Sequence, residues 1–306
     1  MKKFFFSSIL FLLACLTSAA QQTDHVLTDR IQTLICQSGL NEVGVYIHHL
    51  AKNTKVELNA DTIYPTASVV KIPIMCGLFD KIEKGEIDYK TTLTYHDSLS
   101  YSKYDIVGCL KEGSEIALGK VILLMESTSD NTASLWCQAL AGGGKDINQW
   151  LASNGFKDTR VNSRTPGRQE FQKTYGWGQL TPREMARLIT MIRQGKAVSP
   201  AASERMYRTL TNIYWDDRAL SQIPPYVQAA SKQGFVTQST AEVVLVNAPH
   251  GDYVFCIATK NEPVVDREVR KGRQLIRDIS NLLWNYYEPD YDWKLNEELI
   301  QKYMEY

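Results

Sequence analysis

The sequence predicts a mixed α/β fold of the α+β type: an antiparallel sheet with helices from both chain ends, interrupted by an inserted all-helical domain. Three observations predict it. Strand-like segments occur in two groups, one near the N-terminus and one in the last third of the chain. Within each group they follow one another as hairpins rather than as strand–helix–strand units, which is typical of antiparallel pairing. The stretch between the two groups carries mostly helical periodicity.

The first 20 residues read as a secretory signal rather than as part of the fold. Two lysines precede an apolar run over residues 4–13, and small residues end the segment before Gln21. The run is shorter than the roughly 20 apolar residues that span a bilayer. A second reading makes Cys15, in "LLAC", the lipid-bearing first residue of a lipoprotein. We therefore expect an exported protein, either periplasmic or held at a membrane by a lipid anchor.

The N-terminal group begins with a helix over residues 24–38, whose apolar positions fall on one face and which Gly39 closes. The segments "EVGVYIHHL" and "TKVEL" read as strands joined by the turn sequence "AKNT". These elements place residues 21–66 in the sheet domain.

The inserted domain is expected over residues 67–204. Its helical segments are 70–84, 118–129, 131–142, 147–155 and 181–195. Residues 159–180, "TRVNSRTPGRQEFQKTYGWGQL", show no clear period and read as a long ordered loop. Such a loop inside a compact domain is more often functional than filler.

The chain then returns to the sheet domain over residues 205–288. A helix over 199–210 leads into strands at 227–236, 241–249 and 252–260, and an amphipathic helix follows at 269–286. Residues 289–306 form an acidic, aromatic tail.

Composition excludes several functions. Lys+Arg and Asp+Glu both count 34, so the chain lacks the charge footprint of a nucleic-acid-binding protein. The cysteines and histidines show no metal-ligand spacing, and we expect neither a metal nor a cofactor. Besides Cys15 five cysteines remain, an odd number that leaves at least one unpaired. We expect a monomer that acts on a small molecule and has no membrane contact beyond a lipid anchor at Cys15.

One short motif places a serine beside a lysine. In "YPTASVVKIPI", Lys71 follows Ser68 by three residues, so a helix that starts near Ser68 brings both side chains to one face. Pro73 is tolerated because the first helical N–H groups have no partners within the helix. A partly desolvated lysine next to a second cation can act as a general base. The alternative is a buried helix start with a lysine that extends to solvent.

Two further motifs follow along the chain. Ser129, Asp130 and Asn131 form a Ser-Asp-Asn string, although Asp130-Asn131 also suits a plain helix N-cap. Lys232 and Gly234 lie inside a predicted strand, where a glycine often marks the close approach of a ligand.

In this order the three motifs resemble the S-x-x-K, S-D-N and K-T-G signature of serine penicillin-recognising enzymes. The spacings, 129 − 68 = 61 and 232 − 129 = 103 residues, are similar to those of class A β-lactamases. "TPREMARLI" is similar to the segment that follows the omega loop in that family. The resemblance covers residues 24–288 and implies the same sheet domain plus helical domain, with the active site between them.

The resemblance implies a role for each matching residue. Ser68 would be the nucleophile that forms an acyl-enzyme, and Lys71 would take or relay its proton. Ser129 would pass a proton to the leaving nitrogen, with Lys232 keeping the local field positive. Asn131 would bind the substrate's acyl-side amide. The remaining implied binding positions are Gln233, Gly234 and Phe235, whose backbone N–H would form an oxyanion hole with that of Ser68.

Two departures from the family pattern bear on function. Gln233 replaces the K-T-G hydroxyl residue, and Glu242 lies where the family's carboxylate-binding arginine is expected, leaving Arg160, Arg164 and Arg168 of the loop as candidates. The slot of the water-activating omega-loop glutamate falls around residues 164–166, which include no base. Glu170 is the nearest carboxylate; the alternatives are a rearranged loop that brings it into the site, or a surface glutamate.

Three functions therefore remain open. The first is an exported serine β-lactamase acting through Ser68. The second keeps the nucleophile but makes a cell-wall peptide or small ester the substrate, with β-lactams as slow acylators. The third is a binding or sensing module without turnover.

Overall fold

A computed structural model describes residues 20–263, 270–291 and 293. Its centre is a six-stranded sheet in the order β1-β3-β2-β11-β10-β9. The strands are β1 (Gln22–Thr23), β2 (Val43–His49), β3 (Thr54–Leu58), β9 (Ala229–Val236), β10 (Ser239–Val246) and β11 (Tyr253–Thr259). All neighbours pair antiparallel except β1 and β3. The N-terminal and C-terminal strands thus join where β2 meets β11, as the sequence predicts.

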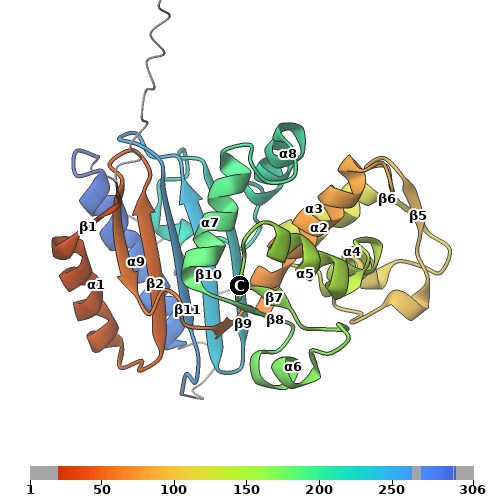
Figure 1. Ribbon diagram of the computed structural model, residues 1–306, viewed down its shortest axis with the longest axis horizontal. Coiled ribbons are helices and arrows are strands. Elements are labelled where there is room, and N and C mark those ends of the chain that lie inside the picture. The colour runs from red at the N-terminus through yellow and green to blue at the C-terminus, as the bar shows by residue number, and fades with distance from the viewer. Residues whose placement is uncertain (1–19, 264–269, 292, 294–306) are drawn as a thin grey trace, which may run out of the picture.

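Both faces of this sheet are covered (Figure 1). Helices α1 (His25–Ser38) and α9 (Lys271–Tyr287) pack together on one face, and α7 (Pro182–Arg193) lies on the other. Strand β10 is buried at every position because alternate residues enter the two cores. Val243 faces the α7 side and Val244 the α1 and α9 side. The sequence analysis placed α7 in the helical insertion over residues 67–204. In the structure, the apolar face of α7 packs on the sheet.

A helical block stands beside the sheet, at the β9 edge (Figure 1). It contains α2 (Lys71–Glu83), α3 (Leu118–Ser127), α4 (Asn131–Leu140) and α5 (Gly143–Ser153), while α8 (Pro200–Leu210) contacts α7, α3 and β9. Short 3₁₀ turns are η1 (Ala67–Val70), η2 (Asp97–Leu99), η3 (Val107–Cys109) and η4 (Leu220–Gln222), and β5 (Thr92–Thr94) pairs with β6 (Glu115–Ala117). The division of the chain into a sheet domain (residues 21–66 and 205–288) and a helical domain (residues 67–204) stays a prediction.

The long segment over 159–180 is more regular than its sequence indicates. It holds β7 (Arg160–Val161), α6 (Gln169–Tyr175) and β8 (Gly178–Leu180). Strand β8 pairs with β7 and also with β4 (Tyr64–Pro65), directly before η1. These strands are only two or three residues long, too short for a period-2 pattern, so their pairing depends on tertiary contacts.

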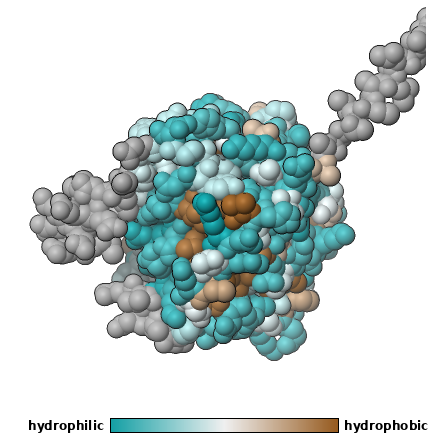
Figure 2. Space-filling view, turned by 90° about the vertical axis from the view of Figure 1, so that its left-hand side faces the viewer, coloured by the Kyte–Doolittle hydropathy of each residue, from teal (hydrophilic) through white to brown (hydrophobic). Residues whose placement is uncertain are grey.

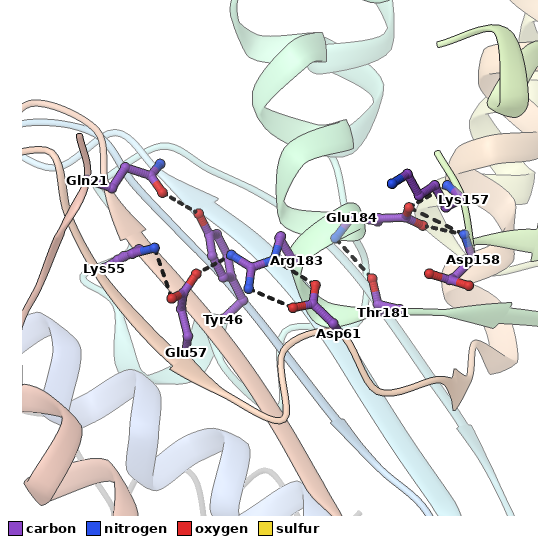
Figure 3. Close-up of polar contacts among 10 residues, drawn as sticks. All are labelled: Gln21, Tyr46, Lys55, Glu57, Asp61, Lys157, Asp158, Thr181, Arg183 and Glu184. Carbon is purple, nitrogen blue, oxygen red and sulfur yellow. Dashed lines mark hydrogen bonds and ion pairs between the residues drawn. The ribbon is translucent and has the colours of Figure 1, made fainter. Parts of the chain in front are cut away.

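The first turn of α7 ties this segment to the sheet (Figure 3). Arg183 contacts Glu57 of β3 and bonds both oxygens of Asp61, at 2.7 and 2.8 Å. Glu184 accepts the backbone N–H groups of Lys157 at 2.6 Å and Thr159 at 2.7 Å. The start of the 159–180 segment is therefore held by a helix that is itself packed on the sheet.

The β1 edge of the sheet lies at the end of the molecule away from the helical block (Figure 1). Viewed from the side of α1 and β1, the described surface is mostly hydrophilic, with small hydrophobic patches (Figure 2). The expected signal segment, Cys15 and most of the 289–306 tail lie outside the described residues. The five cysteines of the described chain are all free. None of the helices in that part of the chain is long and apolar enough to cross a membrane.

Candidate active site

Lys71 lies at the centre of a compact polar cluster between the helical block and β9. It is the first residue of α2 and is fully buried. Its amine nitrogen lies 3.1 Å from the Ser68 hydroxyl oxygen and 2.9 Å from the Asn131 side-chain oxygen. It also lies 2.9 Å from the Ser129 hydroxyl oxygen and 2.6 Å from the Ser129 carbonyl oxygen. Two motifs separated by about sixty residues of sequence thus meet at one amine.

Lys232 brings the third motif to the same place. Its side chain is buried on β9, and its amine nitrogen lies 3.1 Å from the Ser129 hydroxyl oxygen and 3.2 Å from the carbonyl oxygen of Gln233. The Ser129 hydroxyl is therefore within hydrogen-bond distance of both amines, from Lys71 and from Lys232. This arrangement can carry a proton between the two lysines and a group bound above them.

Burial sets the protonation of both amines. It is the main cause that lowers the pKa of Lys71 well below its ordinary value, and the positive charge of Lys232 lowers it further. Burial likewise lowers the pKa of Lys232 to about 8. A lysine with a lowered pKa can take a proton from a hydroxyl near neutral pH.

Two residues with positive φ help to place the hydroxyl groups. Ala67, directly before Ser68, has φ +44°, and Ser129 has φ +61°. Such conformations cost on the order of 1–3 kcal/mol for residues other than glycine and persist only where the surroundings hold them. The side chain of Asp130 helps to hold the second, since it caps α4 by accepting the N–H of Ala133 at 2.7 Å and also accepts that of Val107 at 2.8 Å. Asp130 is thus the N-cap of α4, which was the alternative interpretation of the Asp130-Asn131 pair.

Gly234 is a point of close approach, but the approaching group is the backbone of the chain itself and not the ligand that the sequence suggested. A β carbon at this position would stand 2.5 Å from the backbone nitrogen of Ser68 and 2.8 Å from the carbonyl oxygen of Thr66. The next residue, Phe235, is half-exposed at the open side of β9. The two N–H groups expected to form an oxyanion hole, on Ser68 and Phe235, therefore lie on segments that touch each other.

Gln233 makes contacts that the sequence did not suggest. Its amide nitrogen donates to the carbonyl oxygen of Trp215 at 2.9 Å and lies 3.4 Å from a carboxylate oxygen of Asp217. The indole N–H of Trp215 in turn donates to the carbonyl oxygen of Thr128, at 2.9 Å. Gln233 thus holds the 215–217 segment against the site, and its donor group is engaged within the protein.

The structure does not bring Glu170 into the cluster. Its side chain on α6 is 82% exposed and pairs with Lys173 at 2.7 Å, because the first turn of α6 points to solvent. Thr165 lies at the position expected for the water-activating glutamate of the family. It is buried, and its hydroxyl donates to the carbonyl oxygen of Ser163 at 3.0 Å. Glu170 is the sole carboxylate between residues 159 and 180. The expectation that it could reach the site therefore gains no support from its position.

Two of the three loop arginines, Arg160 and Arg168, form hydrogen bonds in or next to the loop. Arg160 donates to the carbonyl oxygen of Thr159, and Arg168 donates to Asn162 and Gln179. Arg164 is exposed, with φ +49°.

A different arginine, which the sequence analysis missed, lies beside residues 232–234. Arg218 is buried, and a guanidinium nitrogen lies 3.3 Å from the carbonyl oxygen of Gly234. Burial lowers the pKa of Arg218 to about 10, while the buried carboxylate of Glu242 favours its charged form. The one sequence signal was Glu242, an acidic residue inside a largely apolar strand, because a carboxylate is rarely fully buried without a partner.

Comparisons with known proteins identify the family to which the chain is similar. A model of the Beta-lactamase enzyme family matches residues 26–287. Beta-lactamase VEB-1 of Pseudomonas aeruginosa is 24% identical over 279 residues, which cover 87% of this chain and 91% of that protein. Beta-lactamase PSE-4 of the same organism is 23% identical over 208 residues, or 66% of this chain and 71% of that protein.

Solved structures show the same fold. A variant of PBP-A, described as an acyl-enzyme complex with penicillin G, has a TM-score of 0.78 at 24% identity, covering 88% of this chain and 99% of that one. A β-lactamase from Chitinophaga pinensis has a TM-score of 0.74 at 18% identity, covering 85% and 99%. The fold class expected from the sequence is thereby confirmed.

Proposed function

Because the chain belongs to the Beta-lactamase enzyme family, we propose that it is a serine hydrolase that opens β-lactams and forms an acyl ester on Ser68. One observation carries the proposal: the hydroxyl groups of Ser68 and Ser129 share the buried amine of Lys71. A hydroxyl nucleophile within hydrogen-bond distance of a base with a lowered pKa is the arrangement that covalent catalysis needs.

The proposed acylation transfers one proton from Ser68 to the lactam nitrogen and returns Lys71 and Ser129 to their starting states. Neutral Lys71 takes the Ser68 proton as the oxygen attacks the lactam carbonyl carbon. When the carbon–nitrogen bond breaks, the nitrogen takes the hydroxyl proton of Ser129, and Ser129 regains a proton from the Lys71 ammonium. The distances from the Lys71 amine to the two hydroxyl oxygens, 3.1 and 2.9 Å, suit both transfers.

Binding contacts would surround the reacting carbonyl. The N–H groups of Ser68 and Phe235 would hold the oxyanion, a contribution of about 3 kcal/mol for each donor. Asn131 would bind the acyl-side amide. Arg218 and the ammonium form of Lys232 would attract a substrate carboxylate, in place of the hydroxyl that Gln233 lacks. The oxyanion-hole and Asn131 roles are those that the resemblance to the family implies, and the role of Arg218 is proposed from its place beside Gly234.

Turnover is proposed to be slow. The 159–180 segment offers no carboxylate to activate water at the ester, since Glu170 is exposed and paired with Lys173. This observation favours a second candidate function: a hydrolase or transferase for a cell-wall peptide or small ester, which β-lactams acylate and leave slowly. A member of this fold, the PBP-A variant, has been captured as an acyl-enzyme with penicillin G.

A module that only binds β-lactams or related ligands is the third candidate. Two buried amines placed around two hydroxyl groups cost stability. A module that only binds gains nothing from them in return. The complete set of Ser68, Lys71, Ser129, Asn131 and Lys232 therefore favours chemistry. We further propose an exported, periplasmic monomer, or the lipoprotein that Cys15 would allow.

A chromogenic cephalosporin separates the three functions. The purified protein is mixed with excess substrate, and product is followed with time while the mass of the protein is measured. Steady turnover supports a β-lactamase, and one equivalent followed by a stall, with Ser68 acylated, supports the slow acyl-enzyme. No product and no labelling by a fluorescent penicillin supports the binding module. Ser68→Ala is the negative control, and Glu170→Gln is expected to leave the time course unchanged.

A further inference from the structure

Glu126 is a buried carboxylate that the steps above do not use. It lies near the end of α3, three residues before Ser129, and its side chain is fully buried. Among the described residues, neither of its oxygens has a hydrogen-bond partner. A buried carboxylate without partners is costly, and groups of this kind concentrate at functional sites.

The surroundings of Glu126 connect it to the catalytic amines. Its carboxylate interacts electrostatically with Lys232 and Lys71, and for each amine it is the strongest of the charges that favour the protonated form. The same segment that delivers the Ser129 hydroxyl to both amines thus also delivers a negative charge to them. Other titratable or charged groups interact with this cluster from the neighbouring elements: Cys76 of α2, Cys137 of α4, Asp130 at the N-cap of α4, Asp105 before η3, Glu242 of β10, and Arg218.

We propose that Glu126 is a positioning residue of this active site, whose carboxylate holds one proton on the amine pair of Lys71 and Lys232 and so sets the pH range in which Ser68 is acylated. The inference rests on the proposed acylation of Ser68. It adds a buried residue of α3 to the residues that the motifs supply.

Charge balance is the physical reason. Two buried ammonium groups with no counter-ion would be very unfavourable, and two neutral amines would leave Arg218 without the ammonium of Lys232 in attracting a substrate carboxylate. One carboxylate balances one ammonium, so the second amine can remain neutral. Lys71, bonded to Ser68, is then the free base, and Lys232 is the ammonium. Burial raises the pKa of Glu126 to about 7 and lowers the pKa of Lys232 to about 8. Burial and the positive charge of Lys232 lower the pKa of Lys71 well below its ordinary value.

The pH dependence of acylation tests this role. The second-order rate of labelling by a fluorescent penicillin is measured from about pH 5 to pH 10 for the wild-type protein and for Glu126→Gln, Glu126→Met and Glu126→Asp. Without the carboxylate the amines lose their protons at lower pH. Both limbs of the profile should therefore move down by about one pH unit in the Gln and Met variants. The Asp variant keeps the charge and should keep the wild-type profile.

Controls separate this role from a structural one. Glu262→Gln removes another buried carboxylate, one placed against Thr259, and should leave the profile unchanged. Thermal unfolding shows which variants fold; Gln and Met are both used because one is polar and the other apolar. An unshifted profile in the folded Gln or Met variant overturns the inference, as does failure of both to fold while Asp folds. If the wild-type protein itself is not labelled, the proposed function fails.

Discussion

The backbone nitrogen of Ser68 lies 2.5 Å from the point where a β carbon on Gly234 would stand. Strand β9 therefore packs directly against the turn that carries the nucleophile, and only a residue without a side chain allows this approach. The contact joins the sheet to the helical block at the place where the chemistry is proposed.

Replacing Gly234 by Ala tests this contact. The new methyl group meets backbone atoms of Ser68 and Thr66, which cannot rotate away, so β9 or the turn must shift. We expect a loss of about 1–3 kcal/mol in unfolding free energy. Labelling of Ser68 by a fluorescent penicillin should slow by roughly tenfold or more, because each 1.4 kcal/mol in the barrier is tenfold in rate. Unchanged labelling would show that the turn and strand move independently.

Ser129→Ala removes the hydroxyl that lies between the two amines. Proton delivery to the leaving nitrogen should then slow acylation by about 10²- to 10⁴-fold, the range for a lost general acid. Rapid mixing with a chromogenic cephalosporin measures the rate. Ser127→Ala is the matched control, two residues earlier, and should retain the wild-type rate. If both variants behave alike, Ser129 has no part in the transfer.

Gln233→Ala distinguishes a structural from a substrate-binding role. The change removes the hydrogen bonds to Trp215 and Asp217, so unfolding free energy should fall by about 1–2 kcal/mol. Gln238→Ala, at an exposed position after the same strand, should cost little. The opposite result, unchanged thermal unfolding with a raised KM for carboxylate-bearing β-lactams, would identify Gln233 as a substrate contact.

The charge of Lys232 predicts a pH dependence of binding. Its pKa is lowered to about 8, so the side chain is an ammonium below that pH and loses its proton above it. KM for a carboxylate-bearing β-lactam should therefore rise as pH increases through 8. Lys232→Arg remains charged throughout, and its KM should vary less with pH. Equal pH dependence in the two proteins would contradict the assignment.

Glu184→Ala tests the anchor of the 159–180 segment. The carboxylate accepts the N–H groups of Lys157 and Thr159, and its loss leaves them without these acceptors. We expect faster hydrogen exchange at these amides and a stability loss of about 1–3 kcal/mol. Glu204→Ala on α8, where the side chain is exposed and pairs with Arg208, is the control. Exchange as slow as in the wild type would show that other contacts hold the segment.

Local signals predicted most of the elements. Periodicity identified α1 and the strands of the sheet, and Gly39 ends α1 with φ +65°, as a C-terminal glycine should. The same signals did not reveal α6 or the short strands β7 and β8, because segments of two to seven residues contain too little pattern. They also did not show that α7 packs on the sheet, since an amphipathic helix does not specify its partner.

What the sequence alone determined is the order and chemical type of the motifs: a serine and a lysine one helical turn apart, a second serine, and a second lysine in a strand. Those motifs predicted the cluster at Lys71 through the family resemblance that they carry. The tertiary structure decided which other charges join it, placing Arg218 and Glu126 near the cluster, engaging Gln233 with Trp215 and leaving Glu170 at the surface. The physical reason is that spacing along one helix or strand brings side chains together by local geometry. Desolvation and pairing between distant segments depend on how the sheet and the helical block pack.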